Sequence, residues 1–262
     1  MNPADGNVTV FHKAEAGGND FVLIEGAPPP PDQVADVVVA LCRRRYGIGA
    51  DGAVWWERTG ADTLRVRTYD SDGSVASGCI NGLRCAARLA RHLGWGSEAV
   101  RLETPAGTYA AYVGAASVTV RVPGPAVRAA AWPGGHVVTV GEDHLVLPPA
   151  DGPAMSTAAF QELCLGLRAS GVQDVNIHHL TYDHGAWHLR SWELGNEVET
   201  PACGSGSLAA ACALRELGRL SGAASFSTAG GAVLTAQPSG SAWDLTGPSR
   251  VVCRGELSRR WS

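Results

Sequence analysis

The chain contains one pattern twice, and this internal repeat restricts the possible folds more than any other feature of the sequence. An offset of 124 residues places Cys79 on Cys203, and "CINGLRCAARLARHLG" and "CGSGSLAAACALRELG" then have the same length from Cys to Gly. The same offset aligns further pairs: Gly47 with Gly171, Gly82 with Gly206, Leu93 with Leu217, Gly94 with Gly218, Thr104 with Thr228, and Gly107 with Gly231. The repeat predicts two versions of one structural unit, each about half of the 262-residue chain.

Each copy is predicted to contain a strand, a polar turn and a helix that begins near its Cys. Apolar and polar residues alternate in residues 63–70 and 187–194, as is typical of strands. Apolar residues then recur at helical spacing up to Gly94 and Gly218, which are expected to end the two helices. Several short strands follow each helix. Each half is therefore expected to be a helix wrapped by strands, which predicts an α+β fold.

The two domains are expected at residues 1–130 and 131–262. The segment "PGPAVRAAAWPGG" is rich in Pro, Gly and Ala, and it is the predicted join. The first domain then carries Cys79 and the second carries Cys203.

The composition excludes several classes of protein. The net charge of −4 argues against nucleic acid and anionic membranes as partners, and no apolar stretch is long enough to span a bilayer. The start "MNPADGNVTV" lacks the pattern of a signal peptide, so a cytoplasmic location is expected. Seven cysteines, an odd number without a CxxC pair, predict neither a disulfide framework nor a structural zinc site.

The segment "NIHHLTYDHGAWHLRSW" (176–192) holds four His, which could suggest a metal site. Its alternating pattern and the turn signal "DHG" favour an ordinary β-hairpin instead. No metal is therefore expected.

A thiol at the start of a helix has unusual chemistry. Unpaired backbone N–H groups and the helix dipole favour negative charge there and lower the pKa of a Cys. The Gly three residues after each Cys leaves backbone amides open to an anion such as a carboxylate. Four interpretations of Cys79 and Cys203 remain open: two inert buried thiols, a nucleophile with His144 as partner, a redox pair, or an acid and a base that work on opposite faces of an amino-acid α-carbon.

Longer stretches of the chain resemble the diaminopimelate epimerase family. The matching strings lie along nearly the whole chain: "AGGNDFVLIEG" (16–26), "RRYGIGADG" (44–52), "DSDGSVASGCINGLRCAAR" (70–88), "ETPACGSGSLAAA" (199–211), "STAGG" (227–231) and "LTGP" (245–248). The resemblance implies two similar domains related by pseudo-twofold symmetry, each a central helix wrapped by a curved and mostly antiparallel sheet. It also implies an active site in the cleft between them, a cofactor-free reaction that uses Cys79 and Cys203, and a possible homodimer.

The resemblance also assigns expected roles to individual residues. Asn19 and Asn81 match positions near the reacting centre, and Gly204 and Ser205 match the helix-start amides that bind the substrate carboxylate. The remaining matches are His144 and Glu193, which flank the catalytic centre, and Asn176, a further substrate contact. Arg44 falls in a family motif where its expected role is structural.

Four positions depart from the family pattern. Leu194 stands where the family has an Arg that binds the distal carboxylate of the substrate, while Asp70 and Glu142 each replace an Asn, and Ile80 replaces a Gly. A bidentate Arg–carboxylate contact is hard to replace, and acids at this place would repel a carboxylate. The departures predict that diaminopimelate is not the substrate and that a neutral or cationic side chain is preferred.

The leading hypothesis is therefore a racemase or epimerase of a different amino acid, independent of PLP and other cofactors, in a specialised or secondary-metabolic pathway. One alternative is an isomerase that shifts a double bond in an unsaturated amino-acid-like or cyclic imino acid. Another is an authentic diaminopimelate epimerase with a rewired distal site, and a third is a binding protein that has kept the fold. The expected partner is a small amino-acid-like molecule.

Overall fold

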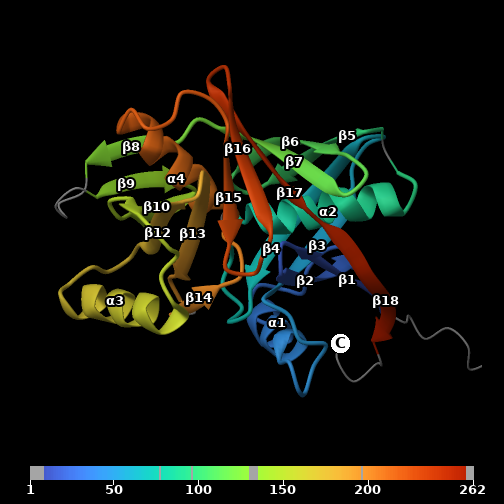
Figure 1. Cartoon of the computed structure of the whole chain (residues 1–262). Coiled ribbons are helices and arrows are strands. Elements are labelled where there is room, and N and C mark those ends of the chain that lie inside the picture. Colours follow the sequence, from blue (N-terminus) through green and yellow to red (C-terminus); the bar gives the residue numbers. More distant parts are fainter. Residues whose placement is uncertain (1–8, 77, 96, 130–134, 196, 258–262) are drawn as a thin grey trace, which may run out of the picture. The chain divides into compact units, whose positions relative to one another are not determined.

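A computed structural model describes residues 9–76, 78–95, 97–129, 135–195 and 197–257 (Figure 1). The chain divides into two compact units, residues 1–118 with 249–262 and residues 119–248. The end of the chain therefore returns to the first unit. The boundary predicted between residues 130 and 131 lies outside the described residues.

The first unit contains two helices and one sheet. Its elements are β1 (Thr9–Ala16), β2 (Asn19–Glu25), α1 (Val34–Cys42), β3 (Gly52–Arg58), β4 (Thr63–Asp70), α2 (Ile80–His92), β5 (Ala99–Thr104), β6 (Gly107–Val113), the start of β7 (Ser117–Pro123), and β18 (Arg250–Leu257). The strands follow the order β18-β1-β2-β3-β4-β5-β6. Neighbours are antiparallel except for the parallel pairs β2–β3 and β4–β5.

The second unit repeats this plan. Its elements are the rest of β7, β8 (Ala126–Ala129), β9 (His136–Val140), β10 (Glu142–Val146), β11 (Ala150–Asp151), α3 (Thr157–Ala169), β12 (Asn176–Asp183), β13 (Ala186–Glu193), β14 (Val198–Thr200), α4 (Gly204–Glu216), β15 (Ala224–Thr228), β16 (Val233–Ser239) and β17 (Ala242–Pro248). The main order is β8-β9-β10-β12-β13-β15-β16-β17, again with two parallel pairs, β10–β12 and β13–β15. The duplicated α+β fold predicted from the repeat is confirmed.

The central helix of each unit is enclosed by its own strands. Helix α2 contacts β1 to β6 and β18, and helix α4 contacts β9, β10, β12, β13, β16 and β17 (Figure 1). Helix α4 is so rich in Ala that strands approach it closely, and Leu208 and Leu214 are fully buried. Each such Leu contributes roughly 2 kcal/mol to stability. Gly94 and Gly218, with φ of 75° and 68°, follow the helices as expected.

The predicted hairpin of residues 176–192 is also present. Strands β12 and β13 pair antiparallel, and His184 and Gly185 occupy the turn with positive φ. The alternating pattern and the turn predicted this hairpin, whereas the groups that each His meets depend on the register described below.

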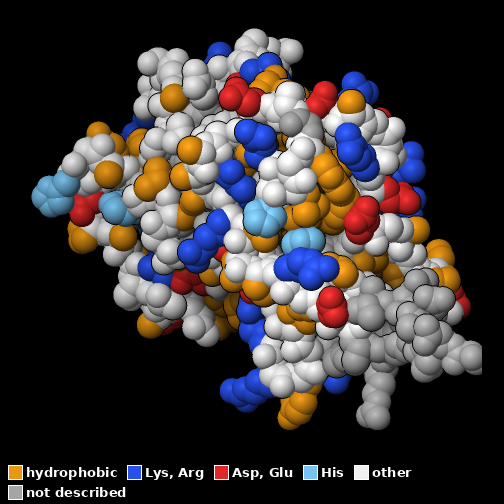
Figure 2. Space-filling model, turned by 90° about the vertical axis from the view of Figure 1, so that its right-hand side faces the viewer, with side chains coloured by type: hydrophobic (Ala, Val, Ile, Leu, Met, Phe, Trp, Pro, Cys, Tyr) orange, Lys and Arg blue, Asp and Glu red, His pale blue; other side chains and the backbone are white. Residues whose placement is uncertain are grey.

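No helix among the described residues is long and apolar enough to cross a membrane. On the face of the molecule in Figure 2, basic and acidic side chains are interspersed with apolar ones. This mixture agrees with the small net charge of the sequence.

Candidate active site

The two predicted thiols occupy equivalent places in the two units. Cys79 is the N-cap of α2 and Cys203 is the N-cap of α4, both with extended backbones. The N–H of Gly82 donates to Cys79 Sγ at 3.4 Å, and the N–H of Gly206 donates to Cys203 Sγ at 3.3 Å. Each thiol therefore lies over the first turn of a helix, where backbone amides stabilise negative charge.

The strands beside the two thiols also correspond residue by residue. In the second unit, Glu142, His144, Asn176, His178, Ser191 and Glu193 lie on one face of β10, β12 and β13, as the register of these strands requires. The same register in β2, β3 and β4 gives their counterparts in the first unit: Asn19, Phe21, Gly52, Val54, Thr68 and Asp70. Asp70 of the first unit is thus the counterpart of Glu193, and Asn19 is the counterpart of Glu142.

We call the residues around Cys79 the first half-site and those around Cys203 the second half-site. A chain of hydrogen bonds organises the first half-site. Asn19 Nδ2 donates to Asp51 Oδ2 at 2.9 Å, and Asn81 Nδ2 donates to Asn19 Oδ1 at 3.0 Å. Arg84 Nη2 then donates to Asn81 Oδ1 at 2.7 Å. The structure therefore joins the predicted site residue Asn19, at the start of β2, to Asn81 in the first turn of α2, and Arg84 of the same helix binds Asn81.

Arg84 is a buried cation, with its side chain fully inaccessible to solvent. Burial lowers the pKa of its guanidinium to about 10, while Cys85, Cys79 and Glu15 act in the opposite direction. By the same interaction, the guanidinium attracts negative charge at Cys79. Arg84 therefore places a positive charge in the surroundings of Cys79.

A second charged cluster anchors the loop that carries Asp51. Arg44 binds both Asp20 and Asp51, and Lys13 lies 2.8 Å from Asp20. Burial alone would raise the pKa of Asp20, but hydrogen bonds from Arg44 and Lys13 outweigh it and lower the pKa to about 2. The arrangement agrees with the structural role expected for Arg44.

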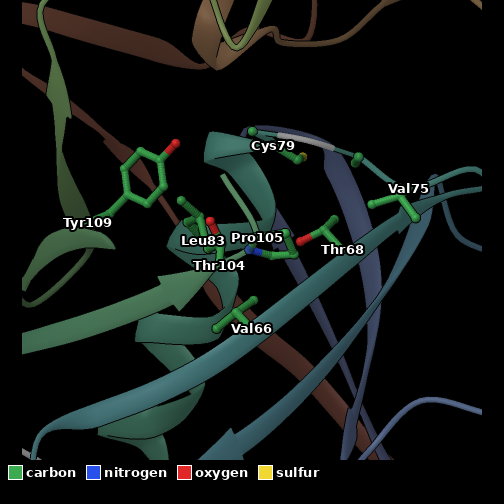
Figure 3. Close-up of a pocket in the computed structure, with 10 residues that line it drawn as sticks. Val66, Thr68, Val75, Cys79, Leu83, Thr104, Pro105 and Tyr109 are labelled. Atoms are coloured by element: carbon green, nitrogen blue, oxygen red, sulfur yellow. The ribbon is translucent and has the colours of Figure 1, made fainter. Parts of the chain in front are cut away.

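A pocket opens beside Cys79 within the first unit. Figure 3 shows Cys79 between Thr68 and Val75 on the right and Leu83 and Tyr109 on the left. The complete lining consists of Val66, Thr68, Val75, Ala76, Gly78, Cys79, Leu83, Thr104, Pro105 and Tyr109. Cys79 is thus half-buried at the wall of a mostly apolar hollow.

Cys203 has a different environment from Cys79, because it is only 5% exposed. Burial raises the pKa of Cys203 well above its usual value, and the charge of Glu193 and a hydrogen bond to it act in the same direction. Ser205 Oγ, at 3.5 Å, and the Gly206 N–H partly offset these effects. The second half-site therefore favours the neutral thiol.

Two buried imidazoles lie beside Cys203. His144 Nδ1 and His178 Nε2 are 2.9 Å apart, and His178 Nδ1 is 3.0 Å from Ser191 Oγ. Burial lowers the pKa of His144 to about 4, against the opposing effects of the Val140 backbone and Asp143. Burial and then His144 lower the pKa of His178 well below its usual value. Both rings are therefore neutral near pH 7.

Two of the four positions that depart from the family pattern, Glu142 and Leu194, are joined through Asn176 in the second unit. Asn176 Nδ2 donates to Glu142 Oε2 at 3.0 Å, and the Leu194 N–H donates to Asn176 Oδ1 at 2.9 Å. Leu194 is 41% exposed and supplies no charge. The amide of Asn176 is thus engaged by groups of the protein itself, with a carboxylate where the sequence comparison expects an Asn.

The remaining predicted residues lie at the ends of the strands and helices described above. Ile80 is the buried first residue of α2, and Asp70 is the last residue of β4. Gly204 and Ser205 form the start of α4, as expected.

Sequence reasoning missed His178, Ser191, Asp51 and Arg84 as members of the two half-sites. Strand periodicity could have found His178, because residues two apart on a strand share a face and Asn176 was already a candidate. Ser191 then follows as the residue opposite His178 in the register. The inward direction of the Arg84 side chain had no comparable signal.

Comparison with known proteins agrees with this duplicated fold. The family model for diaminopimelate epimerase matches residues 11–126. The diaminopimelate epimerase of Gemmatimonas aurantiaca is 32% identical over 276 residues, which cover 95% of this chain and 99% of the relative.

Two solved structures share the fold at low sequence identity. A hydroxyproline epimerase from Agrobacterium vitis, with bound trans-4-hydroxy-L-proline, has a TM-score of 0.68 at 15% identity and covers 98% of this chain and 94% of its own. A methylitaconate-Δ-isomerase has a TM-score of 0.56 at 12% identity, with 97% and 96% covered. Fold and relatives together define the class as racemases, epimerases and related isomerases. Within that class, the chain belongs to the diaminopimelate epimerase family.

Proposed function

We propose that this protein inverts the α-carbon of an amino acid by proton transfer at Cys79 and Cys203, without PLP. The observation that carries the proposal is the pair of thiols at equivalent helix N-termini with opposite surroundings. Arg84 acts on Cys79, whereas Glu193 and two neutral imidazoles lie around Cys203. One thiolate and one thiol are the two groups that an inversion needs.

In the proposed reaction, the Cys79 thiolate takes the α-proton and becomes a thiol. The electron pair left on the carbon is delocalised into the substrate carboxylate, whose charge the amides at the starts of α2 and α4 can stabilise. The Cys203 thiol then gives its proton to the opposite face of the same carbon and becomes a thiolate. The reverse reaction starts with Cys79 as the thiol and Cys203 as the thiolate. An enzyme that rests with Cys79 as the thiolate and Cys203 as the thiol therefore favours substrates of one configuration.

We propose that the substrate has one carboxylate and a neutral or cationic side chain. Glu142 and Leu194 supply negative charge and an apolar group at the positions where the family binds a distal carboxylate. A second carboxylate at this place would be repelled by Glu142 and would lack an Arg. Because the full-length relative is named a diaminopimelate epimerase, diaminopimelate is the alternative substrate to test.

The test is proton NMR in D₂O under reductant, with diaminopimelate and a panel of single-carboxylate amino acids with neutral and basic side chains. Loss of the α-proton signal with inversion in the panel, and none with diaminopimelate, is the expected result. The double variant Leu194→Arg with Glu142→Asn should gain exchange of diaminopimelate and lose activity on its best cationic substrate. Fast exchange of diaminopimelate by the unaltered protein would contradict the proposed substrate class and identify an authentic diaminopimelate epimerase.

A second candidate function is a proton shift that moves a double bond. It is favoured by the unequal surroundings of the two thiols and by the fold shared with a methylitaconate-Δ-isomerase. Silence from every saturated amino acid, with conversion of an unsaturated imino acid that needs only one thiol, would support it. A homodimer and a cytoplasmic location stay predictions.

A further inference from the structure

The second unit holds a cluster of three buried metal-ligand groups that proton transfer alone does not explain. His144, His178 and Cys203 each offer one ligand atom, and these three atoms lie within 4.8 Å of one another. None of the three side chains is more than 5% exposed. We propose that these groups form a binding site for a divalent ion of the zinc class. While the ion is bound, Cys203 cannot take part in the proposed proton transfer. Only this last consequence rests on the proposed function.

The two imidazoles are held in an orientation that suits ligands. Ser191 Oγ contacts His178 Nδ1 at 3.0 Å, so Nε2 of the same ring faces His144. A polar partner on the far nitrogen is what orients most metal-binding His residues. The nitrogens that face each other in the cluster are His144 Nδ1 and His178 Nε2, which are 2.9 Å apart. An ion bound between them would replace the hydrogen bond between the two rings and accept a lone pair from each nitrogen.

The first unit shows that the fold itself does not need this cluster. The counterparts of His144 and His178 are Phe21 and Val54, which are buried apolar residues. An apolar pair therefore occupies the equivalent strand positions without any buried polar side-chain atom. Because two buried imidazoles are less favourable than such a pair, their presence at Cys203 points to a chemical role.

The distances fit a thiolate-binding ion after small movements. Zinc binds imidazole nitrogen at about 2.0–2.1 Å and thiolate sulfur at about 2.3 Å, so tetrahedral ligand atoms lie roughly 3.3–3.6 Å apart. His144 Nδ1 and His178 Nε2 are 2.9 Å apart, and no two of the three ligand atoms are more than 4.8 Å apart. Shifts of about 1 Å in the side chains would suffice. The Glu193 carboxylate, which is hydrogen-bonded to Cys203, could serve as a fourth ligand.

Binding has a defined proton balance. The ion replaces the proton of the Cys203 thiol, which is released to the solvent, and the thiolate sulfur then binds the metal. The mixed sulfur and nitrogen donors select zinc, cadmium or cobalt(II) over magnesium and calcium. A thiolate held in this way cannot donate a proton to substrate carbon.

The test is an anaerobic titration of chelator-treated protein with Co²⁺, followed by absorbance. One equivalent of Co²⁺ should give a thiolate-to-cobalt charge-transfer band and the intense visible bands of a tetrahedral site, with release of one proton. Cys203→Ser should remove the charge-transfer band, and Cys79→Ser should keep it. His178→Val, which copies the first unit, should weaken Co²⁺ binding by at least about tenfold.

A band that disappears with Cys79→Ser, or an affinity that is unchanged in His178→Val, would overturn the proposal. The same holds if millimolar Co²⁺ gives no charge-transfer band. His178→Gln is the second variant if His178→Val fails to give a cooperative unfolding transition. Since absorbance needs no turnover, the metal site can stand even if the proposed isomerase activity fails. If both hold, micromolar Zn²⁺ should inhibit the unaltered enzyme and EDTA should restore it.

Discussion

The first turns of α2 and α4 have the same geometry but different chemical surroundings. Cys79 is half-buried beside an apolar pocket and is influenced by the cation Arg84. Cys203 is buried and lies beside the carboxylate of Glu193 and the neutral ring of His144. The comparison teaches that two equivalent helix N-termini can differ in their surroundings, through Arg84 on α2 in the first unit and through the Glu and His side chains on the strands of the second unit.

The largest effect should come from removing each thiol in turn. Cys79→Ser and Cys203→Ser should each reduce inversion of the preferred amino acid by about 10³-fold, because an alcohol is far too weakly acidic for the task. Initial rates measured from both enantiomers would check this. If one variant keeps nearly full activity, the two half-sites do not share one inversion.

The next effect concerns the glycines that follow the thiols. A Cβ at Gly206 would lie 2.2 Å from His178 Cε1, whereas a Cβ at Gly82 would lie 3.2 Å from the Thr68 side chain. Gly206→Ala should therefore cost about 3 kcal/mol of unfolding free energy and Gly82→Ala about 1 kcal/mol. Urea unfolding would measure both.

The matched control for this prediction is the double variant Gly206→Ala with His178→Ala. Removal of the ring should recover a large part of the lost stability. Equal effects of the two single variants would contradict the close approach of His178 to α4.

Selective alkylation should distinguish the two thiols directly. Cys79 should react with iodoacetamide at least about tenfold faster than Cys203 at pH 7, because Cys203 is buried with a raised pKa and Cys79 is more accessible. Peptide mass spectrometry over time gives both rates in one sample. The Cys203 rate should rise steeply with pH, and a faster reaction at Cys203 than at Cys79 would reverse the assignment.

The smallest effect should appear on acidification. The pKa of Asp20 is lowered to about 2 in the folded protein, so its contribution to stability is complete above the unfolded pKa near 4 and is lost as the pH falls through about 2. Asp20→Asn should remove about 1 kcal/mol of stability at pH 6 and little at pH 2. Urea midpoints at the two pH values would show the difference.

The control for Asp20 removes its partner instead. Arg44 binds both Asp20 and Asp51, so Arg44→Gln should reduce the loss of stability between pH 6 and pH 2. An unchanged acid sensitivity in Arg44→Gln would mean that the Arg44 cluster is not its source.

The sequence predicted the duplicated plan well because helix starts, turns and strand alternation are local signals. Both thiols, their glycines and the hairpin of residues 176–192 lie where those signals indicated. The surroundings of the thiols depend on register, which joins residues far apart in the chain. Arg84 was missed for this reason, since a helix pattern alone does not say which distant group a side chain meets, whereas strand periodicity from Asn176 could have found His178.

The order of the strands has a consequence for synthesis of the protein. Strand β1 pairs with β18, so the first strand of the chain finds one of its two partners only in the last one. While the ribosome is still translating, that edge of the first unit has unpaired backbone groups, which are open to pairing with other chains. This edge of the first unit can be completed only after β18 has left the ribosome, so a nascent chain stalled before residue 250 exposes the β1 edge and is prone to aggregate.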